Sequence, residues 1–169
     1  MLLPYEDIGE SITRLRTDVA ERGLVQALQD YAERFEERNG LRVTVHVDDA
    51  CEELPPLAAF QLFRFVQEAL TNVRKHAHAS GAAVTLESTG PGRLRVVVAD
   101  DGRGLAADAK PRGRPRTLGL TSMRERVEAL GGTFELASEP GSGTRVSATI
   151  PLPGGTTEQA DAAVATAAG

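Results

Sequence analysis

The stretch that most constrains the fold is QLFRFVQEALTNVRKHAH, residues Gln61–His78. It predicts one long helix, because Pro55-Pro56 precede it and Ser80-Gly81 follow it. At ~100° per residue, five apolar side chains fall on one stripe that faces a core. This stripe consists of Leu62, Val66, Ala69, Val73 and Ala77. The opposite stripe, expected to face water, consists of Arg64, Thr71, Arg74 and His78.

A third stripe of the same helix is polar and borders the apolar one. Glu68, Asn72 and His76 follow one another at i, i+4 and i+8, with Lys75 beside them. A carboxylate, an amide and an imidazole at the edge of a core lose part of their hydration and need polar partners. A metal–phosphate ligand would supply such partners. Taken alone, the pattern fits an ordinary exposed helix edge at least as well.

Composition limits the class of protein. The 169 residues predict one domain with a substantial core. The net charge of −5 gives no indication of nucleic-acid binding. Cys51 is the only cysteine, so no internal disulfide is possible and a reducing compartment fits. The sequence has no apolar run of ~18 residues, so it predicts no membrane span. Its first residues lack signal-peptide features. We therefore expect a cytoplasmic domain, with any membrane anchor in sequence outside this chain.

Apolar periodicity and turn residues predict the remaining elements. Helices are expected over 6–22, 24–39 and 119–130, and strands over 41–47, 82–88, 93–100, 133–138 and 144–151. The Ala/Thr/Gly-rich segment 154–169 predicts a disordered tail. Two hairpins favour a mixed sheet of about five strands with helices on one face, which is a two-layer α/β sandwich.

Two adjacent carboxylates close the strand 93–100 and are followed by Gly-x-Gly, in the order Asp100-Asp101-Gly102-Arg103-Gly104. The first carboxylate can accept a hydrogen bond from an exocyclic amine, while the glycines let a flat ring approach the backbone. The alternative is a tight turn with solvated acids. A dinucleotide-binding fingerprint is excluded, because its glycines lie between a strand and a helix, whereas these open a long polar loop.

Three further segments carry weaker signals. The loop 101–117 holds Arg103, Lys110, Arg112, Arg114 and Arg116, which suits either a mobile cover for a polyanion or a solvated charge run. Gly119 and Leu120 open a helix whose free N–H groups could bind phosphate, or Gly119 is only a helix-start glycine. Thr144, after Gly141-Ser142-Gly143, could hydrogen-bond a base or a water, or serve hairpin geometry alone.

The order of these segments resembles a known family. QEALTNVRKHAHAS is similar to the N box of sensor histidine kinases, DDGRG to their first glycine box, LGLTSMRERVEALGG to the second and GSGTRVSATIPLP to the last. The motifs are most similar to the nitrate/nitrite-sensor subgroup. The resemblance runs from about Gly23 to Pro153 and implies the Bergerat-type ATP-binding fold of the GHKL superfamily, with ATP and Mg²⁺ as cofactors.

The resemblance implies roles at the phosphate end of the nucleotide. Asn72 would bind Mg²⁺ that bridges the ATP phosphates, and Glu68 would act as the catalytic acid that holds or polarises a metal-bound water. Lys75 and His76 would face the phosphates. Gly119 and Leu120 would begin the helix under the triphosphate, with residues 103–117 as the ATP lid.

At the base end, the resemblance implies that Asp100 reads the adenine amino group. Gly102 and Gly104 would give the ring room, and Thr144 would support the base. These kinases transfer the γ-phosphate to a histidine on a separate dimerisation domain, and from there to a response-regulator aspartate. The histidines of this chain, His46, His76 and His78, do not follow the acceptor pattern.

We therefore expect residues 23–153 to be the catalytic ATP-binding domain of a bacterial sensor histidine kinase. Residues 1–22 would be a helical linker or the end of the dimerisation region. The implied partners are the dimerisation domain of the same kinase and a response regulator. Two alternatives remain open at this point: a free-standing protein-serine kinase or ATPase of the anti-sigma-factor type, and a non-catalytic nucleotide-binding module.

Overall fold

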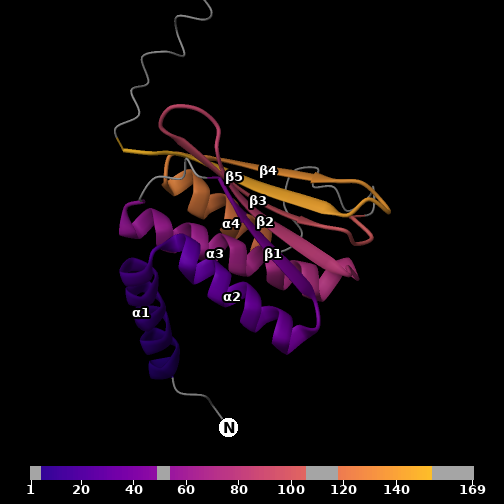
Figure 1. The fold of residues 1–169 in the computed structure, drawn as a ribbon, viewed down its shortest axis with the longest axis horizontal. Coiled ribbons are helices and arrows are strands. Elements are labelled where there is room, and N and C mark those ends of the chain that lie inside the picture. Colours follow the sequence, from indigo (N-terminus) through magenta and orange to yellow (C-terminus); the bar gives the residue numbers. More distant parts are fainter. Residues whose placement is uncertain (1–4, 49–53, 106–117, 154–169) are drawn as a thin grey trace, which may run out of the picture.

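The computed structural model of the protein describes residues 5–48, 54–105 and 118–153, and it has two layers (Figure 1). One layer is a five-stranded sheet in the order β1-β2-β3-β5-β4. Its strands are β1 (Arg42–Val47), β2 (Gly81–Ser88), β3 (Arg93–Asp100), β4 (Thr133–Ser138) and β5 (Thr144–Pro151). Strand β1 pairs with β2 in parallel, and the other pairs are antiparallel. The mixed sheet confirms the predicted fold class.

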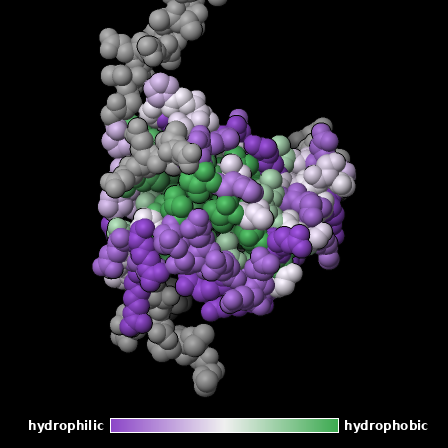
Figure 2. Space-filling view, in the orientation of Figure 1, coloured by the Kyte–Doolittle hydropathy of each residue, from purple (hydrophilic) through white to green (hydrophobic). Residues whose placement is uncertain are grey.

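The second layer consists of helices that cover one face of the sheet (Figure 1). These are α1 (Tyr5–Arg22), α2 (Leu24–Asn39), α3 (Pro56–Asn72) and α4 (Leu118–Ala129), with a π-helical turn, η1 (Val73–Ala77), that continues α3. Helices α2, α3 and α4 contact the strands, whereas α1 contacts α2 and α3. Figure 2 shows α2, whose outward surface is hydrophilic. No helix in the described ranges is long and apolar enough to cross a membrane.

Helix α3 forms the centre of the core. The five side chains of its predicted apolar stripe are all buried, and Phe63, Phe65 and Leu70 are buried beside them. Phe65 meets Phe134 of β4 edge-on, with ring centroids 6.2 Å apart. The buried surface of α3 is therefore wider than one stripe, since α1, α2 and α4 contact this helix as well as β3.

This packing corrects one detail of the sequence interpretation. Arg74 and His78 are exposed as predicted, but Arg64 and Thr71 are only partly exposed. Helices α1, α2 and α4 pack around α3, and both side chains hydrogen-bond to Gln67 on the same helix, at 3.2 Å and 2.8 Å. A long crossover helix between two parallel strands has helical neighbours on its flanks, which periodicity alone does not reveal.

The structure confirms the predicted boundaries of the strands and of α3, and it leaves other predicted segments undescribed. The structure confirms the strands to within one residue, and α3 begins at Pro56 as the paired prolines indicate. Val19 of α1 is 1% exposed and lies in the same core as the rest of the chain, so the end of the predicted linker packs on the domain. The predicted tail 154–169 and most of the predicted lid, residues 106–117, lie outside the described residues.

Candidate functional site

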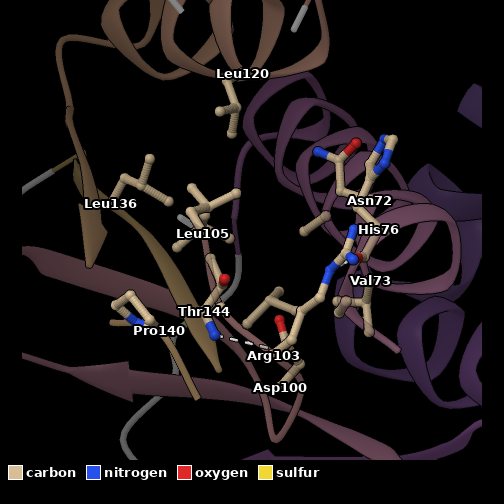
Figure 3. Close-up of a pocket in the computed structure, with 15 residues that line it drawn as sticks. Asn72, Val73, His76, Asp100, Arg103, Leu105, Leu120, Leu136, Pro140 and Thr144 are labelled. Carbon is tan, nitrogen blue, oxygen red and sulfur yellow. Dashed lines mark hydrogen bonds between the residues drawn. The ribbon is translucent and has the colours of Figure 1, made fainter. Parts of the chain in front are cut away.

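A cavity of about 510 Å³ opens between the end of α3, the start of α4 and the ends of β3 and β5 (Figure 3). Its walls are mainly apolar. The apolar lining comes from Ala69, Val73, Ala77, Val98, Leu105, Leu120, Leu136, Pro140 and Val146. Polar groups are contributed by Asn72, His76, Asp100, Arg103 and Thr144, and Gly104 completes the lining. An apolar pocket with a few convergent polar groups is typical of a small-molecule site.

Asp100, the last residue of β3, supplies the carboxylate of this pocket. Its Oδ1 accepts hydrogen bonds from the N–H groups of Gly102 at 2.8 Å and Thr144 at 3.3 Å. Burial raises the pKa of this carboxyl group, while the two backbone hydrogen bonds act in the opposite direction. Both bonds fall on Oδ1, so the carboxylate is fixed in orientation and Oδ2 has no hydrogen-bond donor within the part of the chain that is described.

The neighbouring acid, Asp101, has a different function. Its Oδ1 accepts hydrogen bonds from the backbone N–H groups of Gly81 and Ser80, at 3.0 Å and 2.8 Å, and its Oδ2 accepts one from the Ser80 hydroxyl at 3.0 Å. The hydrogen bond from Gly81, followed by those from Ser80, lowers the pKa of Asp101. Asp101 does not line the cavity. It ties the end of β3 to the start of β2, and of the two adjacent acids only Asp100 faces the pocket.

The π-helical turn η1 joins this strand end to α3. A π turn accommodates an extra residue and frees carbonyl groups from the helical pattern. Here the Ala77 carbonyl accepts the Arg103 N–H at 2.8 Å, and the His76 carbonyl accepts the Arg103 Nε–H at 2.9 Å. His78 ends the turn with a left-handed φ of 51°. The segment that follows β3 therefore lies directly on the end of the helix.

Close packing accounts for the two glycines of this segment. A Cβ atom on Gly102 would collide with the Ala77 carbonyl oxygen and would lie 2.7 Å from the Ala77 Cβ. A Cβ atom on Gly104 would collide with the Glu139 carbonyl in the turn between β4 and β5. The sequence interpretation assigned both glycines to making room for a ring. The structure adds a requirement within the chain itself, and Gly104 also lines the cavity.

The polar stripe of α3 meets the first turn of α4. A Cβ atom on Gly119 would collide with Glu68 Oε1 and would lie 3.5 Å from Asn72 Nδ2. The Asn72 amide nitrogen also lies 3.9 Å from the sulfur of Met123. The carboxylate and the amide are thus packed beside the N-terminal end of α4, where free N–H groups favour anions.

The residues predicted from sequence fall into two groups. Those lining the cavity are Asn72, His76, Asp100, Gly104, Leu120 and Thr144. Glu68, Gly102 and Gly119 do not line it. Gly102 lies against Ala77 and Asp100, and Gly119 lies beside Asn72, which all line the cavity, whereas Glu68 lies against Gly119. Lys75 is exposed and is absent from the lining. Sequence reasoning treated Arg103 only as a loop cation, and it did not identify the apolar wall from β4 and β5, although strand alternation places Leu136 and Val146 on one face.

Asn72 is the residue predicted to hold a metal, and its surroundings limit what it could hold. No three His, Cys, Asp or Glu residues gather into a metal site within the described ranges. Mg²⁺ prefers oxygen ligands, retains several waters and is commonly held by one or two protein ligands together with substrate phosphates. The Asn72 amide, with Glu68 one turn earlier, fits a metal ion that arrives with a phosphate ligand.

Comparison with known proteins decides the family. Residues 58–154, more than half of the chain, match the family described as histidine kinase-, DNA gyrase B- and HSP90-like ATPase. The chain belongs to this ATPase family. It is 36% identical over 144 residues to the histidine-protein kinase/phosphatase DegS of Brevibacillus brevis, which covers 85% of this chain and 36% of DegS. It is 30% identical over 143 residues to the nitrate/nitrite sensor protein NarQ of Escherichia coli, covering 85% and 25%.

A solved structure agrees with these relatives. The blue-light activated histidine kinase of Erythrobacter litoralis has a TM-score of 0.71 and 26% identity, with 84% of this chain and 46% of that chain covered. The findings confirm the predicted fold and the resemblance to sensor histidine kinases, including the nitrate/nitrite-sensor subgroup. The domain that matches the ATPase family, residues 58–154, corresponds to their ATP-binding catalytic domain. The chain spans about a quarter to a third of the length of DegS and NarQ.

Proposed function

We propose that the cavity binds ATP with Mg²⁺ and that this domain supplies the γ-phosphate to a histidine on a dimerisation domain outside the chain. The observation that carries the proposal is the placement of Asp100 and Asn72 in the wall of one apolar cavity. A carboxylate suited to an exocyclic amine and an amide suited to a metal–phosphate group are thereby offered to the same ligand. A purine nucleoside triphosphate such as ATP carries an exocyclic amine on its base and metal-binding phosphates at its other end.

At the base end, the apolar walls would enclose the purine. Asp100 Oδ2 would accept a hydrogen bond from the exocyclic amine, because Oδ1 already accepts the N–H groups of Gly102 and Thr144. The Thr144 hydroxyl lies 2.9 Å from the Ser138 hydroxyl. This contact supports the position of Thr144 beside the base, which agrees with the supporting role that the resemblance implies.

At the phosphate end, Asn72 would hold Mg²⁺ together with the phosphates, and the metal ion would neutralise part of their charge. Glu68 would orient a water beside this group, since its carboxylate lies against Gly119 at the start of α4. The backbone N–H groups of the first turn of α4, including those of Gly119 and Leu120, would face the phosphates. His76 lines the same end, and Lys75 would contribute long-range attraction from the surface.

The proposed partners follow from the reaction. Phosphoryl transfer needs in-line positioning of donor and acceptor with charge neutralisation, so a dimerisation domain must present its histidine at the open phosphate end. The phosphohistidine would then react with a response-regulator aspartate. We propose a cytoplasmic location for this domain, where ATP is available.

Radiolabelled ATP tests the proposed reaction. The chain incubated alone with [γ-³²P]ATP and Mg²⁺ is expected to bind nucleotide but to gain almost no acid-labile phosphate. Label should appear on an added dimerisation domain of this kinase subgroup that carries the acceptor histidine. Strong phosphohistidine on this chain alone would contradict the proposal. Acid-stable phosphoserine on a partner would instead favour a free-standing serine kinase.

A further inference from the structure

We propose that Arg103 binds the 5′ phosphates of the nucleotide and gives the site its preference for phosphorylated ligands over nucleosides. This inference rests on the proposed function, because it requires that the cavity take a nucleotide. It assigns the phosphate contact to Arg103, which lines the cavity, and not to Lys75, which does not. Three observations support it: a fixed backbone, a fixed guanidinium and a positive charge that pairs with no carboxylate within the described ranges.

The backbone of Arg103 has little freedom to move. Its N–H donates to the Ala77 carbonyl at 2.8 Å. The preceding Gly102 lies so close to the π turn that a methyl group would collide with it. The Cα atom of Arg103 is therefore held against the end of α3, close to the elements that carry Asn72 and His76.

The side chain is held a second time. Its Nε–H donates to the His76 carbonyl at 2.9 Å. Figure 3 shows the side chain extending from beside Asp100 towards Asn72 and His76. A guanidinium is planar, so fixing Nε also limits where the two terminal NH₂ groups can lie. These groups make no hydrogen bond or ion pair to the residues that the structure describes, and they are free to bind a ligand.

The positive charge of Arg103 has no ion-pair partner among the described residues of the cavity wall. Arg103 is the only lysine or arginine among the described residues of the lining, and Asp100 is the only carboxylate. No ion pair joins the two within the described ranges. A guanidinium that is already oriented forms short, charge-assisted and often bidentate hydrogen bonds with phosphate. A bound triphosphate would supply the negative charge that the wall lacks around Arg103.

A purely structural role for Arg103 would be to pin the π turn through the His76 carbonyl. The two roles differ in their dependence on the ligand. Loss of a phosphate contact weakens ATP binding and leaves adenosine binding intact, since adenosine has no phosphate. Loss of a structural hydrogen bond to the His76 carbonyl would displace Asp100 and weaken the binding of both ATP and adenosine.

The test compares Arg103→Gln, Arg103→Lys and the wild type, with Arg74→Gln as a control that removes the same charge from an exposed position outside the cavity. ATP binding is measured by calorimetry and adenosine binding by NMR chemical-shift titration, which is suited to weak ligands. Arg103→Gln is expected to weaken ATP binding by roughly 10-fold or more, from the loss of a charged hydrogen bond. Adenosine affinity and melting temperature should stay at the wild-type values, and Arg103→Lys should be intermediate.

Three results would overturn the inference. They are an unchanged ATP affinity in Arg103→Gln, an equal loss for ATP and adenosine, and an equal loss of ATP affinity in Arg74→Gln. A wild-type protein that binds neither ATP nor adenosine would contradict the proposed function itself, and that result is distinguishable from the other three.

Discussion

Asp100→Asn is expected to weaken ATP binding by roughly 10- to 100-fold, the cost of losing one hydrogen bond to a charged group. The asparagine oxygen can still accept the N–H groups of Gly102 and Thr144, as Oδ1 does now. Its NH₂ group then replaces Oδ2, so a donor would face the amino group of the adenine. Isothermal titration calorimetry with ATP, and with GTP for comparison, measures the loss.

The same substitution is expected to raise the melting temperature of the nucleotide-free protein at neutral pH. Burial raises the pKa of Asp100 above its ordinary value of 3.8, so the fold favours the protonated carboxyl group. The stability that this group contributes is complete below pH 3.8 and is lost as pH rises through the raised pKa. The gain from asparagine should therefore be largest at neutral pH and should disappear in acid, which thermal melts from pH 3 to 7 would show.

Asp101→Asn is the matched control, because this acid is adjacent in sequence but does not line the cavity. Its ATP affinity should stay within about 2-fold of the wild type, because the lost charge is screened by solvent. The asparagine oxygen can still accept the N–H groups of Ser80 and Gly81, and its NH₂ group can donate to the Ser80 hydroxyl. Equal losses of ATP affinity in Asp100→Asn and Asp101→Asn would show that charge near the strand end matters and that a specific base contact does not.

Gly102→Ala is expected to destabilise the fold by about 1–3 kcal/mol, the usual cost of an overpacked site. The added methyl group would meet the carbonyl oxygen and the Cβ of Ala77, the latter at 2.7 Å, and Asp100 Oδ1 at 2.8 Å. Backbone atoms cannot move aside as the end of a flexible side chain can. The substitution should therefore reduce both the free energy of unfolding and the affinity for ATP, measured by urea denaturation and calorimetry.

Gly81→Ala provides the comparison for this prediction. Its new Cβ would lie 3.4 Å from the Arg42 carbonyl, an ordinary contact distance, and Gly81 does not line the cavity. It should change the free energy of unfolding much less than Gly102→Ala does. If the two variants unfold at the same urea concentration, the close contact between Gly102 and the π turn does not hold in solution.

Much of the fold follows from local sequence signals. Alternation in the strands and the spacing of Leu62, Val66 and Ala69 place these side chains in the core, as the structure confirms. Short glycine-bearing turns predict the two hairpins, which form as β2–β3 and β4–β5. The order of strands in the sheet, with β5 between β3 and β4, depends on contacts between distant segments and has no local signal.

The site shows the same division between local and distant information. Asp100 and Asn72 could be predicted as site residues from the order of the motifs and the family resemblance, and both line the cavity. The π turn could not, because Val73 and Ala77 continue the helical apolar stripe without interruption. The position of Arg103 depends on that turn, since both of its anchoring carbonyls belong to it. Sequence alone therefore placed Arg103 in a mobile loop, whereas the structure places it in the wall of the cavity.

Calorimetric titration of ATP, with Mg²⁺ and with EDTA, into the wild type and Asn72→Ala tests the central claim most directly. Thr71→Ala serves as the control on the same helix, because Thr71 does not line the cavity. The wild type and Thr71→Ala should bind ATP more tightly with Mg²⁺ than without it, and Asn72→Ala should lose that difference. A wild-type protein that gives no heat of binding, and whose melting temperature does not move at saturating Mg·ATP, would contradict the account.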